Sequence, residues 1–168
     1  SDAAVAFISY RAEAIVAGSG GSRTMPLDRF FVWPDSNIMA ENVLQPGELL
    51  THVNIPQTSP HHRSLFLKAR ERQTQDFALA SVALVLELDG GHIRDARLTL
   101  GGVAPVPYCV PHVEEALHGA SVDGIDPKAI GELAVQGARP LRDNQYKVAL
   151  TASLVARAVR TLLEETAR

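Results

Sequence analysis

The chain has 168 residues, and its 16 Lys and Arg against 19 Asp and Glu give a formal net charge of −3. With 46% hydrophobic and 21% charged residues, its composition is that of a globular chain rather than a disordered one. The mild acidity argues against binding to nucleic acid or anionic lipid. The longest apolar stretch, 81–88, is too short to span a bilayer, and the single cysteine excludes an internal disulfide. These features predict a soluble, intracellular protein of one domain, or of one small domain joined to part of another.

The pattern of residues 1–57 indicates that the chain begins at a helix that is already part of a folded domain. Ser1 stands where a residue would cap a helix, and neither a basic segment nor an initiator Met precedes the apolar pattern that follows. We therefore expect the chain to be a fragment of a longer protein or one piece of a cleaved one. The elements expected next are a helix over 3–8, a strand over 13–17, a glycine-rich hairpin turn at 18–22, a helical turn over 26–31 and a strand over 48–55 ended by Pro56.

Residues 63–168 follow a linker at 57–62. Their sequence pattern predicts several strands followed by helices. Strands are expected over 64–70, 82–88 and 93–100, with Asp89-Gly90-Gly91 as a hairpin turn, which gives an antiparallel sheet of about three strands. The expected helices begin at Pro111 and end before Gly119, begin at Asp126-Pro127 and end at Gly137, and run over 144–165. This order indicates an α+β fold with helices covering one face of the sheet.

The residues that most often carry chemistry give weak signals here. The six histidines lie in separate elements or side by side in a loop, without metal-ligand spacing, so we expect no metal site. Cys109 has no base placed near it by the sequence, and we expect a buried or half-buried free thiol rather than a nucleophile. Gly101-Gly102 indicates either the close approach of a ligand or another backbone, or simply a bulge or strand exit. No catalytic residue is predicted.

Lys68 is the most unusual polar residue, because it lies in an otherwise apolar strand after Leu65, Phe66 and Leu67. Its ammonium group would be placed to neutralise a phosphate or to donate to a ring carbonyl. The other interpretation is a solvated strand edge whose charges prevent aggregation. The residue pattern by itself favours the solvated edge.

Six segments, taken together in chain order, favour a functional role for Lys68 over a solvated strand edge. They are PGELLTHVNIP at 46–56, FLKARER at 66–72, DFALASVA at 76–83, IRDAR at 93–97, LGGVAP at 100–105 and NQYKV at 144–148. Over essentially the whole chain they resemble the flavin-binding medium subunit of molybdenum hydroxylases, the family of xanthine dehydrogenase and carbon monoxide dehydrogenase. FFVWP at 30–34 and the long connection after it look closest to the aldehyde oxidoreductase branch.

This resemblance implies a subunit that carries FAD. It assigns residues 1–57 to the last part of the flavin-binding domain and 63–168 to the family's C-terminal domain. In that family, electrons pass from a molybdenum cofactor through iron–sulfur clusters to the flavin, which hands them to an acceptor such as NAD or oxygen. The implied partners are an iron–sulfur small subunit and a molybdopterin large subunit. By motif position, Asp2, Leu50 and Lys68 match flavin contacts of the family.

The resemblance also shows what these residues do not include. The family's flavin-binding domain holds the FAD diphosphate with two glycine-rich loops, and both would precede the position of Ser1. We therefore expect this chain alone to bind FAD weakly or not at all, and to need that N-terminal segment as a partner.

Two other functions compete with flavin binding. One is a non-catalytic docking or assembly module that does not bind FAD on its own and forms homo-oligomers through exposed apolar surface. The other is a small-molecule-binding domain with its pocket at Gly101-Gly102. The expected location is the cytoplasm, and export of a folded complex to the periplasm would leave the same sequence pattern.

Overall fold

The computed structural model describes residues 1–72 and 76–166, which form an α+β fold. The first part contains α1 (Asp2–Ser9), β1 (Glu13–Gly18), β2 (Gly21–Pro26), the 3-10 turn η1 (Leu27–Arg29) and β3 (Leu49–Asn54). The second part contains β4 (His62–Ala69), β5 (Ala80–Asp89), β6 (His92–Gly101), β7 (Tyr108–Cys109), α2 (Pro111–Leu117), the 3-10 turn η2 (Val122–Gly124), α3 (Pro127–Ala134) and α4 (Tyr146–Thr166). No helix in these described ranges is long and apolar enough to cross a membrane.

The first sheet is antiparallel, with the strand order β2-β1-β3. Its buried side packs Ala14 and Val16 of β1 against Ile8, Leu27 and Phe30. The predicted helix, strands and helical turn of this part are all present, and the glycine run forms a hairpin turn, as predicted. Strand β2 was not predicted. Its residues, GSRTMP, are almost all exposed, so they carry none of the alternating burial that identifies a strand in a sequence.

The second sheet is antiparallel, with the strand order β4-β5-β6-β7. The first three strands and the two-residue turn at Gly90 and Gly91 match the prediction, and both turn glycines have the positive φ angles that this tight hairpin requires. The prediction of about three strands omitted β7. This strand pairs only Tyr108 and Cys109 with β6, and two residues are too few to show a periodic pattern.

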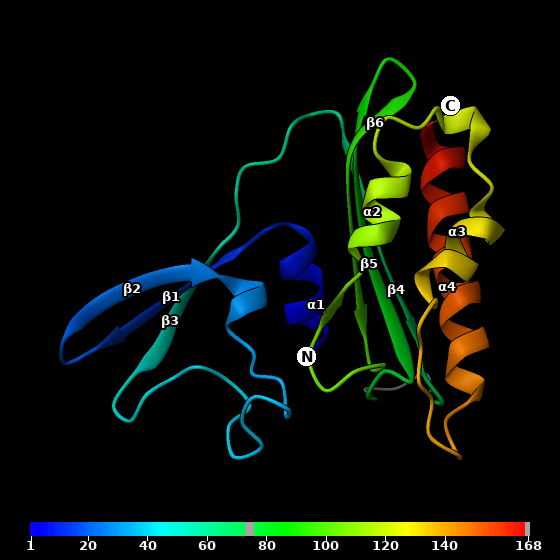
Figure 1. Cartoon of the computed structure of the whole chain (residues 1–168). Coiled ribbons are helices and arrows are strands. Elements are labelled where there is room, and N and C mark those ends of the chain that lie inside the picture. The colour runs from blue at the N-terminus through cyan, green and yellow to red at the C-terminus, as the bar shows by residue number, and fades with distance from the viewer. Residues whose placement is uncertain (73–75, 167–168) are drawn as a thin grey trace.

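Helices cover the second sheet on both faces: the helices that follow the sheet in the chain cover one face, as predicted, and α1 covers the other, which was not predicted. Helix α1 packs against β5 and β6 on one face, whereas α2 and α4 pack on the other and α3 packs on α4 (Figure 1). On the buried side of α4, Val155, Val159 and Leu162 are fully buried in the core of the second sheet. The residues predicted to begin and end helices are also confirmed. The Asp126 side chain caps α3 by accepting a hydrogen bond from the Lys128 backbone N–H, and Gly119 and Gly137, which follow α2 and α3, adopt positive φ angles.

Helix α1 joins the two sheets, and Gly101 makes its close approach possible. A Cβ atom at Gly101 would lie 2.7 Å from Val5 Cγ2 of α1 and 2.4 Å from Ser81 Oγ of β5. At Gly102 the added atom would lie 2.8 Å from the Ala78 carbonyl oxygen. The atoms that approach these two glycines closely therefore belong to other segments of this chain. Neither glycine is among the residues that line the cavity at Trp33 or the cavity at Cys109.

Candidate functional site

Asp2 and Lys68, two of the three predicted flavin contacts, form an ion pair. The Lys68 ammonium donates to Asp2 Oδ2 at 2.7 Å, although the residues lie 66 positions apart in the chain. Asp2 is in the first turn of α1, where the positive end of the helix dipole favours a carboxylate. Because the Asp2 side chain is 45% exposed, the pair stabilises the fold by less than about 1 kcal/mol. Both groups remain accessible from solvent.

The direction of Lys68 follows from strand geometry. Alternate residues of β4 point to opposite faces of the sheet, so Phe66 and Lys68 share the face that carries α1, whereas Leu65 and Leu67 pack into the core beneath α4. Tyr10 donates to Ser64 Oγ at 2.6 Å on the same face, beside the end of α1. Phe66 is 37% exposed. We call Asp2, Phe66 and Lys68 the α1–β4 surface.

Leu50, the third predicted contact, lies on the other sheet. It is on β3, opposite Val16 of β1, and it is 39% exposed. The register of β1 and β3 shifts between Ile15 and Val16, and the Thr51 hydroxyl at this irregularity donates to the Ile15 carbonyl at 3.0 Å. Leu50 therefore shares neither an element nor a sheet with Asp2 or Lys68. The structure thus brings two of the three residues together and leaves the third on a separate strand.

An Arg–Glu pair holds the turn that precedes β3. Arg23 donates to both carboxylate oxygens of Glu48, at 3.0 and 2.8 Å, and the Gln45 backbone N–H donates to the same carboxylate at 2.8 Å. The hydrogen bond from Arg23, followed by that from Gln45, lowers the pKa of Glu48 to about 2 from its ordinary value of 4.5. This pair therefore positions the strand on which Leu50 lies.

The Arg23–Glu48 pair predicts a defined pH dependence. Because the folded-state pKa of Glu48 is below its unfolded value, its stabilising contribution is complete above about pH 4.5 and is lost as the pH falls toward 2. In a carbon-detected NMR titration, the Glu48 carboxylate should have a midpoint near 2, and in an Arg23→Met variant the midpoint should move toward 4.5. An unchanged midpoint in that variant would show that Arg23 does not cause the shift.

Cys109 is half-buried, as predicted, and lines a cavity of about 240 Å³. Burial raises the pKa of its thiol, and the nearby carboxylates of Asp28 and Glu114 add to the increase. Glu114 is itself held by Arg97 at 2.8 Å. A thiol with a raised pKa is a poor nucleophile at neutral pH. No group of three or more His, Cys, Asp or Glu residues in the described part of the chain is placed to hold a metal ion.

A larger cavity of about 370 Å³ lies at the β7 edge of the second sheet. Its lining includes Trp33, Tyr108, Lys147 and Thr151, none of which was predicted from the sequence as a site residue. Neither this cavity nor the one at Cys109 is lined by Asp2, Leu50 or Lys68. Phe66 was also missed as part of a site, although its spacing of two residues from Lys68 in a strand placed both on one face.

Comparison with known proteins shows the family. Residues 65–162 match the CO dehydrogenase flavoprotein C-terminal domain family, and the chain belongs to it. The glyceraldehyde dehydrogenase medium chain of Sulfolobus acidocaldarius is 32% identical over 126 residues, which are 73% of this chain and 41% of that protein. The aldehyde oxidoreductase FAD-binding subunit of Escherichia coli is 29% identical over 141 residues, which are 84% of this chain and 41% of that subunit.

A solved structure shares the fold over nearly the whole chain. This is carbon monoxide dehydrogenase from Hydrogenophaga pseudoflava, in a form that lacks the Mo-pyranopterin moiety of its cofactor. It superposes with a TM-score of 0.83 at 25% identity and covers 96% of this chain and 58% of that one. The resemblance to the C-terminal portion of a flavin-binding medium subunit is confirmed. The chain spans about half the length of the relatives that it matches.

Proposed function

We propose that this chain is part of an FAD-carrying electron-transfer subunit of a molybdenum-cofactor oxidoreductase. Electrons would pass from iron–sulfur clusters through the flavin to an acceptor. In this proposal residues 1–57 end the FAD-binding domain and 63–168 form the C-terminal domain. The partners are an iron–sulfur small subunit and a molybdopterin large subunit. Membership of the flavoprotein C-terminal family and the similarity to an FAD-binding subunit support the proposal.

The observation that carries the proposal is the α1–β4 surface. The pyrimidine edge of a flavin ring presents both carbonyl oxygens and an N–H group. Lys68 supplies donors and Asp2 supplies an acceptor, 2.7 Å apart, beside the exposed ring of Phe66. These residues therefore fit the edge of a planar, polar ring. FAD, when bound, supplies the redox chemistry, and the residues of this chain bind and orient its ring.

The same geometry supports weak binding by this chain alone. Asp2 and Lys68 are accessible at the surface and Leu50 lies on another sheet, and none of the three lines the cavity at Trp33 or the cavity at Cys109. So few contacts do not offset the cost of immobilising a ligand as large as FAD. In our proposal the remaining half of the subunit, which corresponds to the rest of the relatives' length, supplies the other contacts.

The test compares flavin retention in two preparations: this chain alone, and a subunit that joins it to the remaining half. Visible absorbance after desalting should show little FAD on the chain and FAD on the complete subunit. In the complete subunit, Lys68→Met should raise the FAD dissociation constant by about tenfold, because a charge-assisted hydrogen bond is lost. Lys128→Met is the matched control, since Lys128 is an exposed lysine of α3 away from this surface.

Three results would contradict parts of this proposal. Equal FAD retention by the Lys68→Met and Lys128→Met subunits would remove Lys68 from the site. Firm retention of FAD by the chain alone would show that the α1–β4 surface needs no further contacts. A complete subunit that never retains FAD would instead favour the docking or assembly module, for which the exposed apolar side chains of Leu49 and Ile55 provide surface.

A further inference from the structure

The cavity of about 370 Å³ is lined by Trp33 and by three later segments of the chain. One wall is Asn144, which precedes α4, and the first two turns of that helix, where Lys147, Val148 and Thr151 share one face. The other walls are the connection after β6, at 103–105, and the connection between α3 and α4, at 136–140. The volume is at the lower end of the range for small-molecule sites. A compact ligand therefore fits it better than a dinucleotide.

Two aromatic rings from different parts of the chain lie together in this lining. Trp33 and Tyr108 make an edge-to-face contact, with ring centroids 6.3 Å apart and planes at 84°. Trp33 is 42% exposed and Tyr108 is 37% exposed, so their contact leaves ring surface uncovered. Around them the lining is largely apolar, with Leu100 and Val148 among the contributors. Such walls favour a planar, apolar ring.

The charged groups of the cavity are all positive. Lys147 and Arg139 line it, and no Asp or Glu does. The Lys147 ammonium donates to the Gly102 carbonyl at 2.9 Å, and in the described part of the chain neither cation forms an ion pair with a carboxylate. The cavity also lies at the N-terminal end of the 21-residue helix α4, where the helix dipole adds positive potential. The ligand best matched to this field is an anion.

Thr151 supplies a polar group that the fold leaves unused. The residue is only 3% exposed, and its hydroxyl has no hydrogen-bond partner among the described residues. A threonine hydroxyl inside a helix usually donates to the carbonyl four residues before it, and buried polar groups are rarely unpaired. Thr151 lines the cavity, but its hydroxyl oxygen is closed off from solvent, so a ligand would give it the missing partner only after the side chain rotates.

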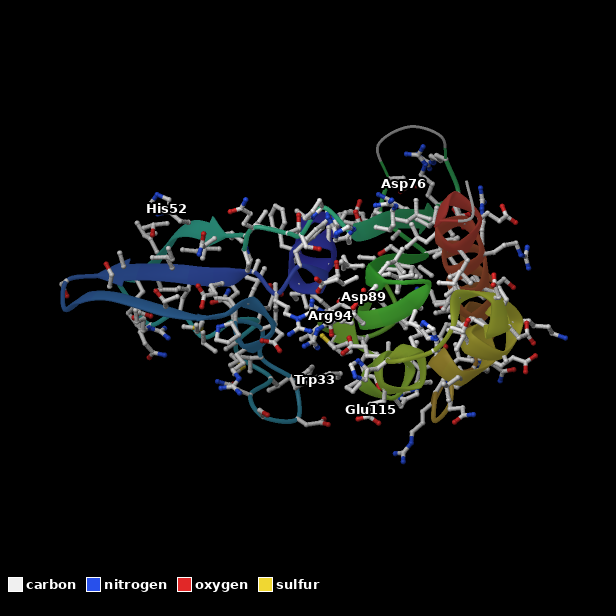
Figure 2. All side chains as sticks on the ribbon, turned by 90° about the horizontal axis from the view of Figure 1, so that it is seen from above. Trp33, His52, Asp76, Asp89, Arg94 and Glu115 are labelled. Carbon is white, nitrogen blue, oxygen red and sulfur yellow. The ribbon has the colours of Figure 1, made fainter. Side chains whose placement is uncertain are left out.

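The cavity is separate from the α1–β4 surface. Lys68 lies on β4 and Tyr108 on β7, and these strands are the two opposite edges of the second sheet. In the view from above, Trp33 lies on the side of the molecule opposite Asp76, which follows β4 in the chain (Figure 2). A ligand in this cavity would therefore not occupy the proposed flavin position.

We propose that this cavity binds a small aromatic carboxylate. Its ring packs beside Trp33 and Tyr108, its carboxylate pairs with Lys147 and Arg139, and a polar atom of the ligand bonds with the Thr151 hydroxyl. This ligand site is additional to the proposed FAD contacts and does not depend on them.

The test uses the 168-residue chain and indole-3-acetate as the probe. Trp33 is the single tryptophan, so its indole N–H gives one assigned signal in a proton–nitrogen NMR spectrum. Indole-3-acetate should shift this signal saturably and bind at least about tenfold more tightly than its neutral amide, indole-3-acetamide. Lys147→Gln should weaken binding of the carboxylate by about tenfold. Arg142→Gln should leave it unchanged, since Arg142 is an exposed arginine near the cavity that does not line it.

Thr151→Val gives a second readout that loss of folding cannot imitate. Because the hydroxyl has no partner in the fold, this variant should unfold at the same or a higher denaturant concentration and yet bind indole-3-acetate about threefold more weakly. Three outcomes would overturn the proposal: no shift of the Trp33 signal, equal affinity for the acid and the amide, or equal binding by the Lys147→Gln and Arg142→Gln variants.

Discussion

Replacing Gly131 with Ala should destabilise the protein, although alanine is the better helix former. Gly131 lies in α3 where that helix crosses α4, and an added Cβ would be 2.3 Å from the Ala152 carbonyl oxygen and 3.2 Å from the Ala156 Cβ. The helix-propensity gain is about 1 kcal/mol. A backbone carbonyl cannot move aside without shifting α4, so overpacking exceeds that gain. We expect a net loss of about 2 kcal/mol, or roughly 4–8 °C in Tm.

Urea unfolding followed by circular dichroism measures this loss, with Gly124→Ala as the matched control. Nothing lies within 4 Å of the Cβ position at Gly124, and its φ is not positive, so that variant should stay within about 0.5 kcal/mol of the parent. A Gly131→Ala protein as stable as the parent would show that α3 and α4 can separate without cost.

Replacing Gly101 with Ala should loosen α1 from the second sheet. The new Cβ would lie 2.4 Å from Ser81 Oγ and 2.7 Å from Val5 Cγ2, in a contact that has no room for it. We expect a loss of about 1–3 kcal/mol in the free energy of unfolding. Because Asp2 is on α1 and Lys68 on β4, the loosened helix should also weaken their ion pair. Hydrogen exchange should accelerate at α1 amides more than at those of α4.

A double-mutant cycle tests the cause of that loss. Val5→Ala removes the methyl groups that the new Cβ would meet, so the Gly101→Ala, Val5→Ala protein should lose less stability than the two single variants added together. Strict additivity would show that Gly101 and α1 are not coupled. In the complete subunit, Gly101→Ala should also reduce FAD retention if the α1–β4 surface holds the ring.

The local elements were predictable because their signals lie within a few residues of each other. Ser1 accepts the Ala4 N–H as a helix cap, and Asp126 and Pro127 open α3 as their residue types predict. The continuous burial of β5 follows from its apolar residues. Strands β2 and β7 escaped prediction because one is almost wholly exposed and the other has two residues. Their pairing is set by neighbouring strands rather than by their own sequence.

The candidate site was only partly predictable. Lys68 in an apolar strand was a visible anomaly, but its partner lies 66 residues away, and only the docking of α1 across β5 and β6 brings Asp2 to it. The resemblance implies both residues as flavin contacts and groups Leu50 with them. The structure instead places Leu50 on β3 of the other sheet.

The class of fold, most element boundaries and the family were predictable from the sequence, because turn residues, caps and apolar periodicity act over short distances and the family motifs are collinear. Which distant groups meet depends on the packing of the folded chain. That packing pairs Asp2 with Lys68, places Val5 against Gly101, and brings Trp33, Lys147 and Thr151 around one cavity. These contacts were not predictable because they depend on how helices and sheets pack across the whole chain, and no local sequence pattern records that packing.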